Sequence, residues 1–175
     1  MSEIRKDYFT NKLVIIPNVK DSGNNSSKFD NKKINCPLCP GNEHMLNPAD
    51  LILIQKGQTL IKITDEEVTN RTKNWNVKIV KEKKPIVSNK PNNVFSNEPL
   101  YNEPGNGEHY RVIATPEHNK TLGNIEVSQL VDSLSIIQDK IRWLYRQKHI
   151  SYVILSVSYG SRSGAFTSHL YFDII

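Results

Sequence analysis

The chain has 175 residues, a formal net charge of +5 and 37% hydrophobic residues. A chain of this length usually forms one domain and buries enough surface to fold without disulfides. The small excess of basic residues argues against a nucleic-acid partner, and no apolar run is long enough to span a membrane. No apolar leader follows Met1, so we expect a cytoplasmic protein with reduced thiols.

The first part of the sequence predicts three short strands separated by polar loops. Apolar and β-branched residues are concentrated at 12–16, 51–54 and 75–80, and the last of these runs alternates apolar with polar residues. The stretches 18–35 and 88–107 are rich in Asn, Ser and Lys or are broken by prolines, so we expect loops there.

The second part predicts three more strands, at 110–114, 152–157 and 170–175, around one long helix. The last strand carries a single charged residue, Asp173, and we expect it to be an unprotected sheet edge. Strands joined by loops, without regular βαβ alternation, favour an α+β fold with a mostly antiparallel sheet. We therefore expect one domain over residues 1–175.

The helix is expected over 126–148, with Asn124 as its N-cap. Its apolar residues recur at intervals of three and four, which predicts a single buried side. The residues on that side are Val127, Leu130, Val131, Leu134, Ile137, Ile141 and Leu144.

Cys36 and Cys39 lie in a segment too rich in Pro and Gly to form a helix. Their spacing fits two corners of a tetrahedral zinc site, a redox pair or two inert buried thiols, and spacing does not decide among these. A zinc site needs two further ligands. The chain offers five histidines for this role: His44, His109, His118, His149 and His169.

Several motifs follow one another in a fixed order along the chain. Residues 36–43 read Cys-Pro-Leu-Cys-Pro-Gly-Asn-Glu, Arg5 precedes the first apolar run, and Trp75 opens the alternating strand. Before the helix come Gly107, His109, Val112, Ile113, Pro116, His118 and Leu122, and after it come Gly160, Ser163, Gly164, Ala165 and His169. In this order the motifs resemble the galactose-1-phosphate uridylyltransferases of the histidine-triad superfamily.

The resemblance implies a histidine-triad-like fold with a structural zinc ion. Its ligands would be Cys36, Cys39, His118 and His169, since these residues match the zinc-binding positions of the family. Two sulfur and two nitrogen ligands close a tetrahedron and leave no open position for a substrate. A satisfied core histidine is the alternative reading of His118.

The matching family transfers a uridylyl group from UDP-glucose to a hexose-1-phosphate through a nucleophilic histidine. Tyr171 stands at that position in this chain, and a phenol is mostly protonated at pH 7. Asp173 replaces a phosphate-binding glutamine, and Phe166 replaces a serine of the phosphate loop. The nucleotide-binding positions of the family correspond to Ser158, Ser163, Gly164, Ala165 and Asp173, although the loop also fits a simple tight turn.

We therefore expect a galactose-1-phosphate uridylyltransferase-like zinc protein, equivalent to the N-terminal half of the family and inactive by itself. The alternative is a zinc-stabilised module that binds a nucleotide or nucleotide sugar without catalysis. The resemblance further implies a homodimer or a complex with a separately encoded second half.

Overall fold

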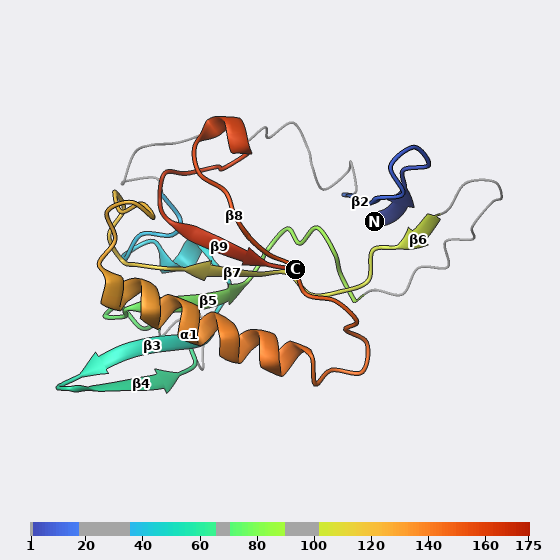
Figure 1. Cartoon of the computed structure of the whole chain (residues 1–175). Helices are drawn as coiled ribbons and strands as arrows, with labels where there is room; N and C mark the ends of the chain where they lie inside the picture. Colours follow the sequence, from blue (N-terminus) through green and yellow to red (C-terminus); the bar gives the residue numbers. More distant parts are fainter. Residues whose placement is uncertain (1, 18–35, 66–70, 90–101) are drawn as a thin grey trace.

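A six-stranded antiparallel sheet forms the body of the molecule in the computed structural model, which describes residues 2–17, 36–65, 71–89 and 102–175. Its strand order is β4-β3-β5-β7-β9-β8 (Figure 1). The strands are β3 (Ala49–Lys56), β4 (Thr59–Ile63), β5 (Val77–Lys81), β7 (Tyr110–Ile113), β8 (Leu155–Val157) and β9 (Tyr171–Ile174).

One face of this sheet packs against a long helix, α1 (Val127–Leu144). Apolar residues that alternate along the strands, such as Ile79, Val112 and Phe172, form the main core with Ile136 and Ile137 of the helix. The alternation predicted for residues 75–80 is the cause, because successive side chains of a strand point to opposite faces.

The other face of the sheet carries a smaller apolar cluster that includes both cysteines. Cys36, Leu38 and Cys39 pack there against Ile52 and Tyr171, just before the short 3₁₀ helix η2 (Glu43–Met45). A second 3₁₀ turn, η3 (Ser161–Ser163), lies between β8 and β9. The face opposite the helix is therefore where the candidate site residues gather.

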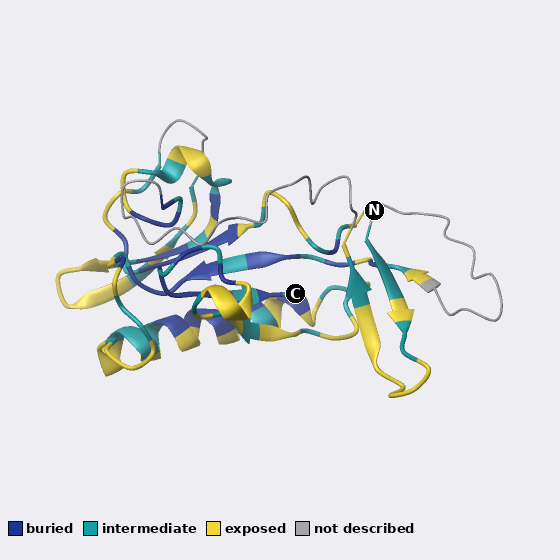
Figure 2. Cartoon of the chain, turned by 90° about the horizontal axis from the view of Figure 1, so that it is seen from above, coloured by how far each residue is buried: buried dark blue, intermediate teal, exposed yellow. Residues whose placement is uncertain are grey.

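A separate three-stranded sheet has the order β2-β1-β6. It comprises β1 (Glu3–Lys6), β2 (Leu13–Ile16) and β6 (Asn102–Pro104), and it stands apart from the main sheet near the N-terminus (Figure 2). Phe9, at the tip of the β1–β2 hairpin, is fully exposed. This sheet contributes nothing to the cluster of cysteines.

The predicted strands are confirmed at 12–16, 51–54, 75–80 and 110–114, with small changes at their ends. Within the described residues, three strands were missed: β1, β4 and β6, the last of which interrupts the loop expected over 88–107. Gly57, with φ 64°, opens the two-residue turn between β3 and β4, a position that favours glycine in hairpins. The loop expected over 18–35 lies outside the described residues.

The last strand of the chain is not the free edge that the sequence suggested. β9 pairs with β7 on one side and with β8 on the other, so the edge strand is β8. The strand expected over 152–157 is confirmed in its second half only, as Leu155–Val157.

The helix begins and ends inside its predicted limits. Asn124 is not the N-cap: its Oδ1 accepts hydrogen bonds from the backbone N–H and the hydroxyl of Thr121, and Glu126 occupies the cap position. The predicted buried side is partly wrong, since Val127, Val131 and Leu134 are exposed. The buried residues are Ser133, Ile136, Ile137, Lys140 and Leu144. Within the described residues, no helix has both the length and the apolar composition of a membrane span.

Candidate metal centre

Two cysteines and two histidines from distant parts of the chain meet beside the sheet. Cys36 and Cys39 belong to the turn before η2, His118 follows β7, and His169 precedes β9. All four are buried, and their ligand atoms lie within 4.8 Å of one another. The set matches the metal ligands that the sequence predicted.

The distances within the cluster fit a tetrahedral metal ion. Cys39 Sγ lies 3.2 Å from His118 Nδ1 and 3.5 Å from His169 Nδ1, and Cys36 Sγ lies 3.7 Å from His169 Nδ1. Tetrahedral zinc with ordinary bond lengths to sulfur and nitrogen separates two such ligand atoms by about 3.6 Å. The four side chains therefore leave room for one ion between them.

Polar neighbours fix the outer side of each histidine ring. His169 Nε2 donates a hydrogen bond of 2.7 Å to the carbonyl oxygen of Thr115, which leaves Nδ1 as the unprotonated nitrogen. His118 Nε2 lies 3.0 Å from Ser168 Oγ. Thr167 Oγ1 lies 3.4 Å from Cys36 Sγ, where its hydroxyl can donate to a thiolate. Partners of this kind orient metal ligands.

Burial lowers the pKa of His169 to about 4, a net value that includes the opposing effect of the Thr115 carbonyl and a smaller lowering by the nearby His118. The imidazole is therefore neutral at pH 7, which is the form that binds a metal. A neutral ring with one nitrogen already engaged has a single free lone pair, and that lone pair faces the two sulfur atoms.

The cysteine turn is closed by hydrogen bonds of its own. The Cys39 N–H donates to the Cys36 carbonyl oxygen over 3.2 Å, and Asn42 Nδ2 donates to the same oxygen over 2.8 Å. Gly41 has a φ of 97°, a left-handed backbone that other residues rarely adopt. The Pro- and Gly-rich sequence thus forms a tight turn that presents both sulfur atoms on one side.

Tyr171 is buried close to this cluster, at the second residue after His169. Its ring packs against Phe166, with the ring centroids 5.1 Å apart, and the Arg111 guanidinium lies 4.8 Å from its centroid. Burial raises the pKa of the Tyr171 phenol, which therefore stays protonated at neutral pH. The side chain is 2% exposed, so it is covered as well as protonated.

Arg111, next to Tyr171, is held by two carboxylates. Its Nε donates to Asp173 Oδ1 over 3.0 Å, and its Nη1 lies 2.6 Å from Glu82 Oε2. His109 Nε2 lies 3.3 Å from the same Asp173 oxygen. Burial tends to raise the pKa of Asp173, but His109 and Arg111 together hold it below its usual value. The positive charge of Arg111 is thus already compensated within the chain.

No protein-family model matches the sequence, and no curated protein matches it either. Solved structures do match. A structure described as a uridylyltransferase has a TM-score of 0.64 and 20% identity, over 98% of this chain and 44% of that chain. An ADP-glucose phosphorylase from Arabidopsis thaliana, solved with ADP-glucose bound, has a TM-score of 0.59 and 21% identity, over 99% and 48%.

A GalT-like protein from Arabidopsis thaliana matches with a TM-score of 0.59 and 23% identity, over 98% of this chain and 46% of that chain. The fold of this chain is therefore similar to the fold of these three structures. The chain spans about half the length of the structures it matches.

The remaining predicted residues lie in the loop that leads to His169, one of the candidate metal ligands. Ser163 is exposed in η3, and its hydroxyl donates to the carbonyl oxygens of Tyr159 and Gly160. Gly164 caps η3 with a φ of 81°, Ala165 is buried, and Ser158 is half-buried after β8. The hydrogen bonds of Ser163 are made within the loop itself. This arrangement is compatible with the simple tight turn that the sequence analysis kept as an alternative to a nucleotide site.

Several polar residues around the site were missed at the sequence level. Thr167 and Ser168 directly precede His169, and a hydroxyl beside a predicted ligand was a signal that could have identified them. The Thr115 carbonyl and the Arg111 guanidinium reach the site only through the folding of β7 beside β9. No sequence spacing could have revealed these two contacts.

Proposed function

We propose that this chain is a zinc-stabilised uridylyltransferase-like domain that does not transfer uridylyl groups by itself. The observation that carries the proposal is the buried set of two thiols and two imidazoles with matching distances. Zinc, when bound there, would cross-link the cysteine turn to the segments that follow β7 and precede β9. Two sulfur and two nitrogen ligands favour zinc among the common divalent metals.

The surroundings of Tyr171 support the absence of transferase activity. A nucleophile must reach its phosphorus atom, yet the phenol is protonated and covered by Phe166 and Arg111. A substrate phosphate that used Arg111 would have to displace Glu82 or Asp173 from it. Side chains of the protein itself therefore occupy the space around Tyr171 that a transferred phosphate would need.

The metal content of the purified protein tests the first part of the proposal. Protein prepared without chelators should contain about one zinc ion per chain, because the ligand set closes a single tetrahedron. Cys39→Ser should lose most of that metal. A folded wild-type protein without metal would contradict the proposal.

An assay of uridylyl transfer tests the second part. The wild-type chain should transfer no uridylyl group from UDP-glucose to galactose-1-phosphate, and Tyr171→His should not restore transfer while Phe166 and Asp173 remain. Transfer by the unmodified chain would contradict the proposal of inactivity but would leave the proposal of a zinc site standing.

A second candidate function is the binding of a nucleotide sugar without catalysis. It is favoured by one solved neighbour, the ADP-glucose phosphorylase, which was solved with ADP-glucose bound. Calorimetric titration with ADP-glucose and UDP-glucose distinguishes the two candidates. Saturable binding of either nucleotide sugar would support the second candidate. No binding would support the first candidate, a zinc-stabilised domain that binds no nucleotide sugar.

We further propose that residues 1–175 act as one domain that associates with a second copy or with a separately encoded second half. The exposed Leu155 and Val157 on the edge strand β8 support association with a second copy. A role in galactose metabolism and a cytoplasmic location are parts of the same proposal, since reduced thiols are available as ligands in that compartment.

A further inference from the structure

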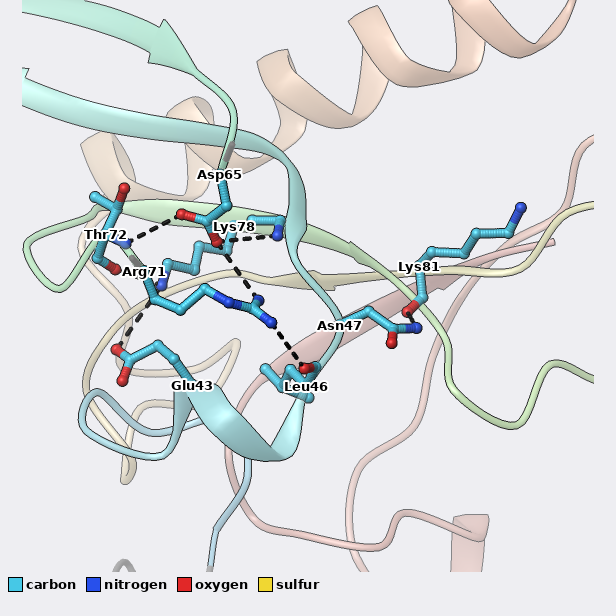
Figure 3. Close-up of polar contacts among 9 residues, drawn as sticks. Glu43, Leu46, Asn47, Asp65, Arg71, Thr72, Lys78 and Lys81 are labelled. Carbon is cyan, nitrogen blue, oxygen red and sulfur yellow. Dashed lines mark hydrogen bonds and ion pairs between the residues drawn. The ribbon is translucent and has the colours of Figure 1, made fainter. Parts of the chain in front are cut away.

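A buried lysine and a largely covered glutamate form a pair of opposite charges beside the cysteine turn, outside the proposed metal ligands. Glu43 is the first residue of η2, and Lys78 belongs to β5. The lysine is 2% exposed, and its Nζ lies 3.8 Å from Glu43 Oε1 (Figure 3). Removing two charges from water is costly, and a well-packed apolar pair is often as stable. A role in fixing the position of the neighbouring cysteine turn would explain why charged residues occupy these two positions.

The two oxygens of Glu43 have different tasks. Oε2 accepts a hydrogen bond of 2.9 Å from the backbone N–H of Gly41, two residues after the ligand Cys39. Oε1 is buried and accepts no hydrogen bond from the described residues, so the nearby Lys78 charge compensates it. A single carboxylate thus connects the cysteine turn to a strand of the main sheet.

Lys78 is itself held from several sides. Its Nζ donates to the Thr72 carbonyl oxygen over 2.6 Å and lies 5.0 Å from the centroid of the Trp75 ring. The Thr72 N–H in turn donates to Asp65, whose carboxylate also accepts from the Ala49 N–H at the start of β3. Figure 3 shows Lys78, Thr72 and Asp65 between η2 and the strands. The lysine is therefore a fixed point on the sheet.

The same sheet sets the position of the histidine ligands. Lys78 is opposite Ile113 in the pairing of β5 with β7, and His118 follows that strand. β7 in turn pairs with β9, which His169 precedes. An anchor on β5 therefore relates the cysteine turn to the two histidines through a continuous ladder of strand pairs.

We propose that Glu43 and Lys78 are positioning residues for the metal centre. They hold the turn over residues 36–41 where both thiols face His118 and His169. This inference rests on the proposed metal-binding function, and it assigns no contact with the metal to either residue.

Zinc release to an excess of chromogenic chelator tests the inference in Glu43→Gln and Lys78→Met. Each variant should release zinc about ten-fold faster than the wild type, since loss of a ligand-orienting partner typically costs 10–100-fold in affinity. Lys78→Arg, which keeps the charge, should release it more slowly than Lys78→Met. If Lys78→Met fails to fold, Glu43→Gln decides, because it keeps the shape of the side chain.

Lys140→Met is the matched control. Lys140 is also buried and paired with a carboxylate, that of Asp50, but it belongs to α1 on the other face of the sheet. This variant should lower the unfolding midpoint while it leaves the rate of zinc release close to the wild-type rate. Equal release rates in Glu43→Gln, Lys78→Met and Lys140→Met would overturn the inference.

The reactivity of the cysteines in chelator-treated protein gives a readout that needs no metal. A thiol-specific reagent should modify Cys36 and Cys39 faster in Glu43→Gln than in the wild type or in Lys140→Met. Faster modification would support the positioning role even if the wild-type protein held no zinc, which would overturn the proposed function alone. Unchanged modification together with unchanged zinc release would exclude the positioning role.

Discussion

His169 and Tyr171 are two residues apart, and the structure gives their side chains different surroundings. His169 faces two sulfur atoms, whereas Tyr171 faces Phe166 and the guanidinium of Arg111. Asp173, two residues further along, binds that guanidinium. Alternate residues of this segment are thus a candidate metal ligand, a covered phenol and a carboxylate in a half-buried ion pair.

Asp173 gives a pH dependence of stability whose sign follows from its contacts. Its pKa is lower in the folded protein than its ordinary value of 3.8, so its charge stabilises the fold fully above pH 3.8. That contribution is lost as the pH falls through the lowered folded-state pKa. Asp173→Asn should therefore be less stable than the wild type at pH 7, and the difference should shrink below about pH 4.

Urea unfolding at pH 7, 5 and 3 measures this difference. The control is Asp139→Asn, since Asp139 forms a more exposed ion pair with Lys62 and should contribute little at any pH. A difference between wild type and Asp173→Asn that stays constant down to pH 3 would contradict the assignment of the charge to Asp173.

At the scale of elements, α1 packs through a side that includes polar residues. Ser133 is fully buried, and its hydroxyl lies within hydrogen-bonding distance of the Ala114 and Gln129 carbonyl oxygens. Lys140 is buried against the rings of Tyr110 and Trp143. These contacts rotate the helix away from the side that its apolar residues alone predicted, and Val127 and Val131 become exposed.

Two alanine substitutions distinguish the buried side of α1 from the predicted one. Ile136→Ala removes a side chain that is 1% exposed and should lower the free energy of unfolding by about 2–5 kcal/mol. Val131→Ala, at a position 58% exposed, should change it by about 0.5 kcal/mol or less. Chemical denaturation of both variants in the presence of zinc measures the effects. Equal losses of unfolding free energy in the two variants would support the buried side of α1 that was predicted from the sequence.

The sequence predicted most of the strands because apolar alternation is a local property. Residues 75–80 and 110–114 show this, since a residue and its neighbours are enough to indicate a strand. The metal ligands were predicted through a family resemblance, because spacing alone left three readings of Cys36 and Cys39 open. The position of β9 between β7 and β8 could not be predicted, since strand order depends on packing between distant segments. The same holds for the contacts of Lys140 and Arg111.

At the scale of the whole molecule, β8 is one of the two edge strands of the main sheet in the described part of the chain. Residues 150–161 contain no charged residue and no proline, the usual protection of a sheet edge. Leu155 and Val157 are each 41% exposed. The other edge strand, β4, carries Lys62. The face available for self-association is therefore at β8, and not at β9 as the sequence suggested.

A lysine on this edge should weaken self-association. We expect the wild-type chain to sediment as a dimer at micromolar concentration and Val157→Lys to sediment as a monomer, because a charge on an edge strand opposes pairing with another strand. Leu60→Lys on β4, which is similarly exposed, is the control and should leave the dimer intact. A monomeric wild type would contradict the prediction.

A metal ion bound at the candidate centre would connect parts of the chain that are otherwise joined through the sheet. Chelation should raise hydrogen exchange at residues 36–46, 115–118 and 165–169, since these segments meet at the ligands. Exchange in the buried half of α1 should change least, because its core with the sheet lies on the opposite face. Cys39→Ser should show the raised exchange without chelator. If hydrogen exchange in these three segments were the same with and without metal, the metal centre would not stabilise them.

Cys36 and His169 are 133 positions apart, so an ion bound between them closes most of the chain into one loop. A disulfide across such a span would be a permanent restraint, whereas a metal cross-link lasts only while the ion is supplied. The stability gained from a ligand grows with the logarithm of its free concentration above the dissociation constant. The lifetime of this protein against cellular proteases would then follow zinc supply, and zinc-starved cells would clear it faster than zinc-replete ones.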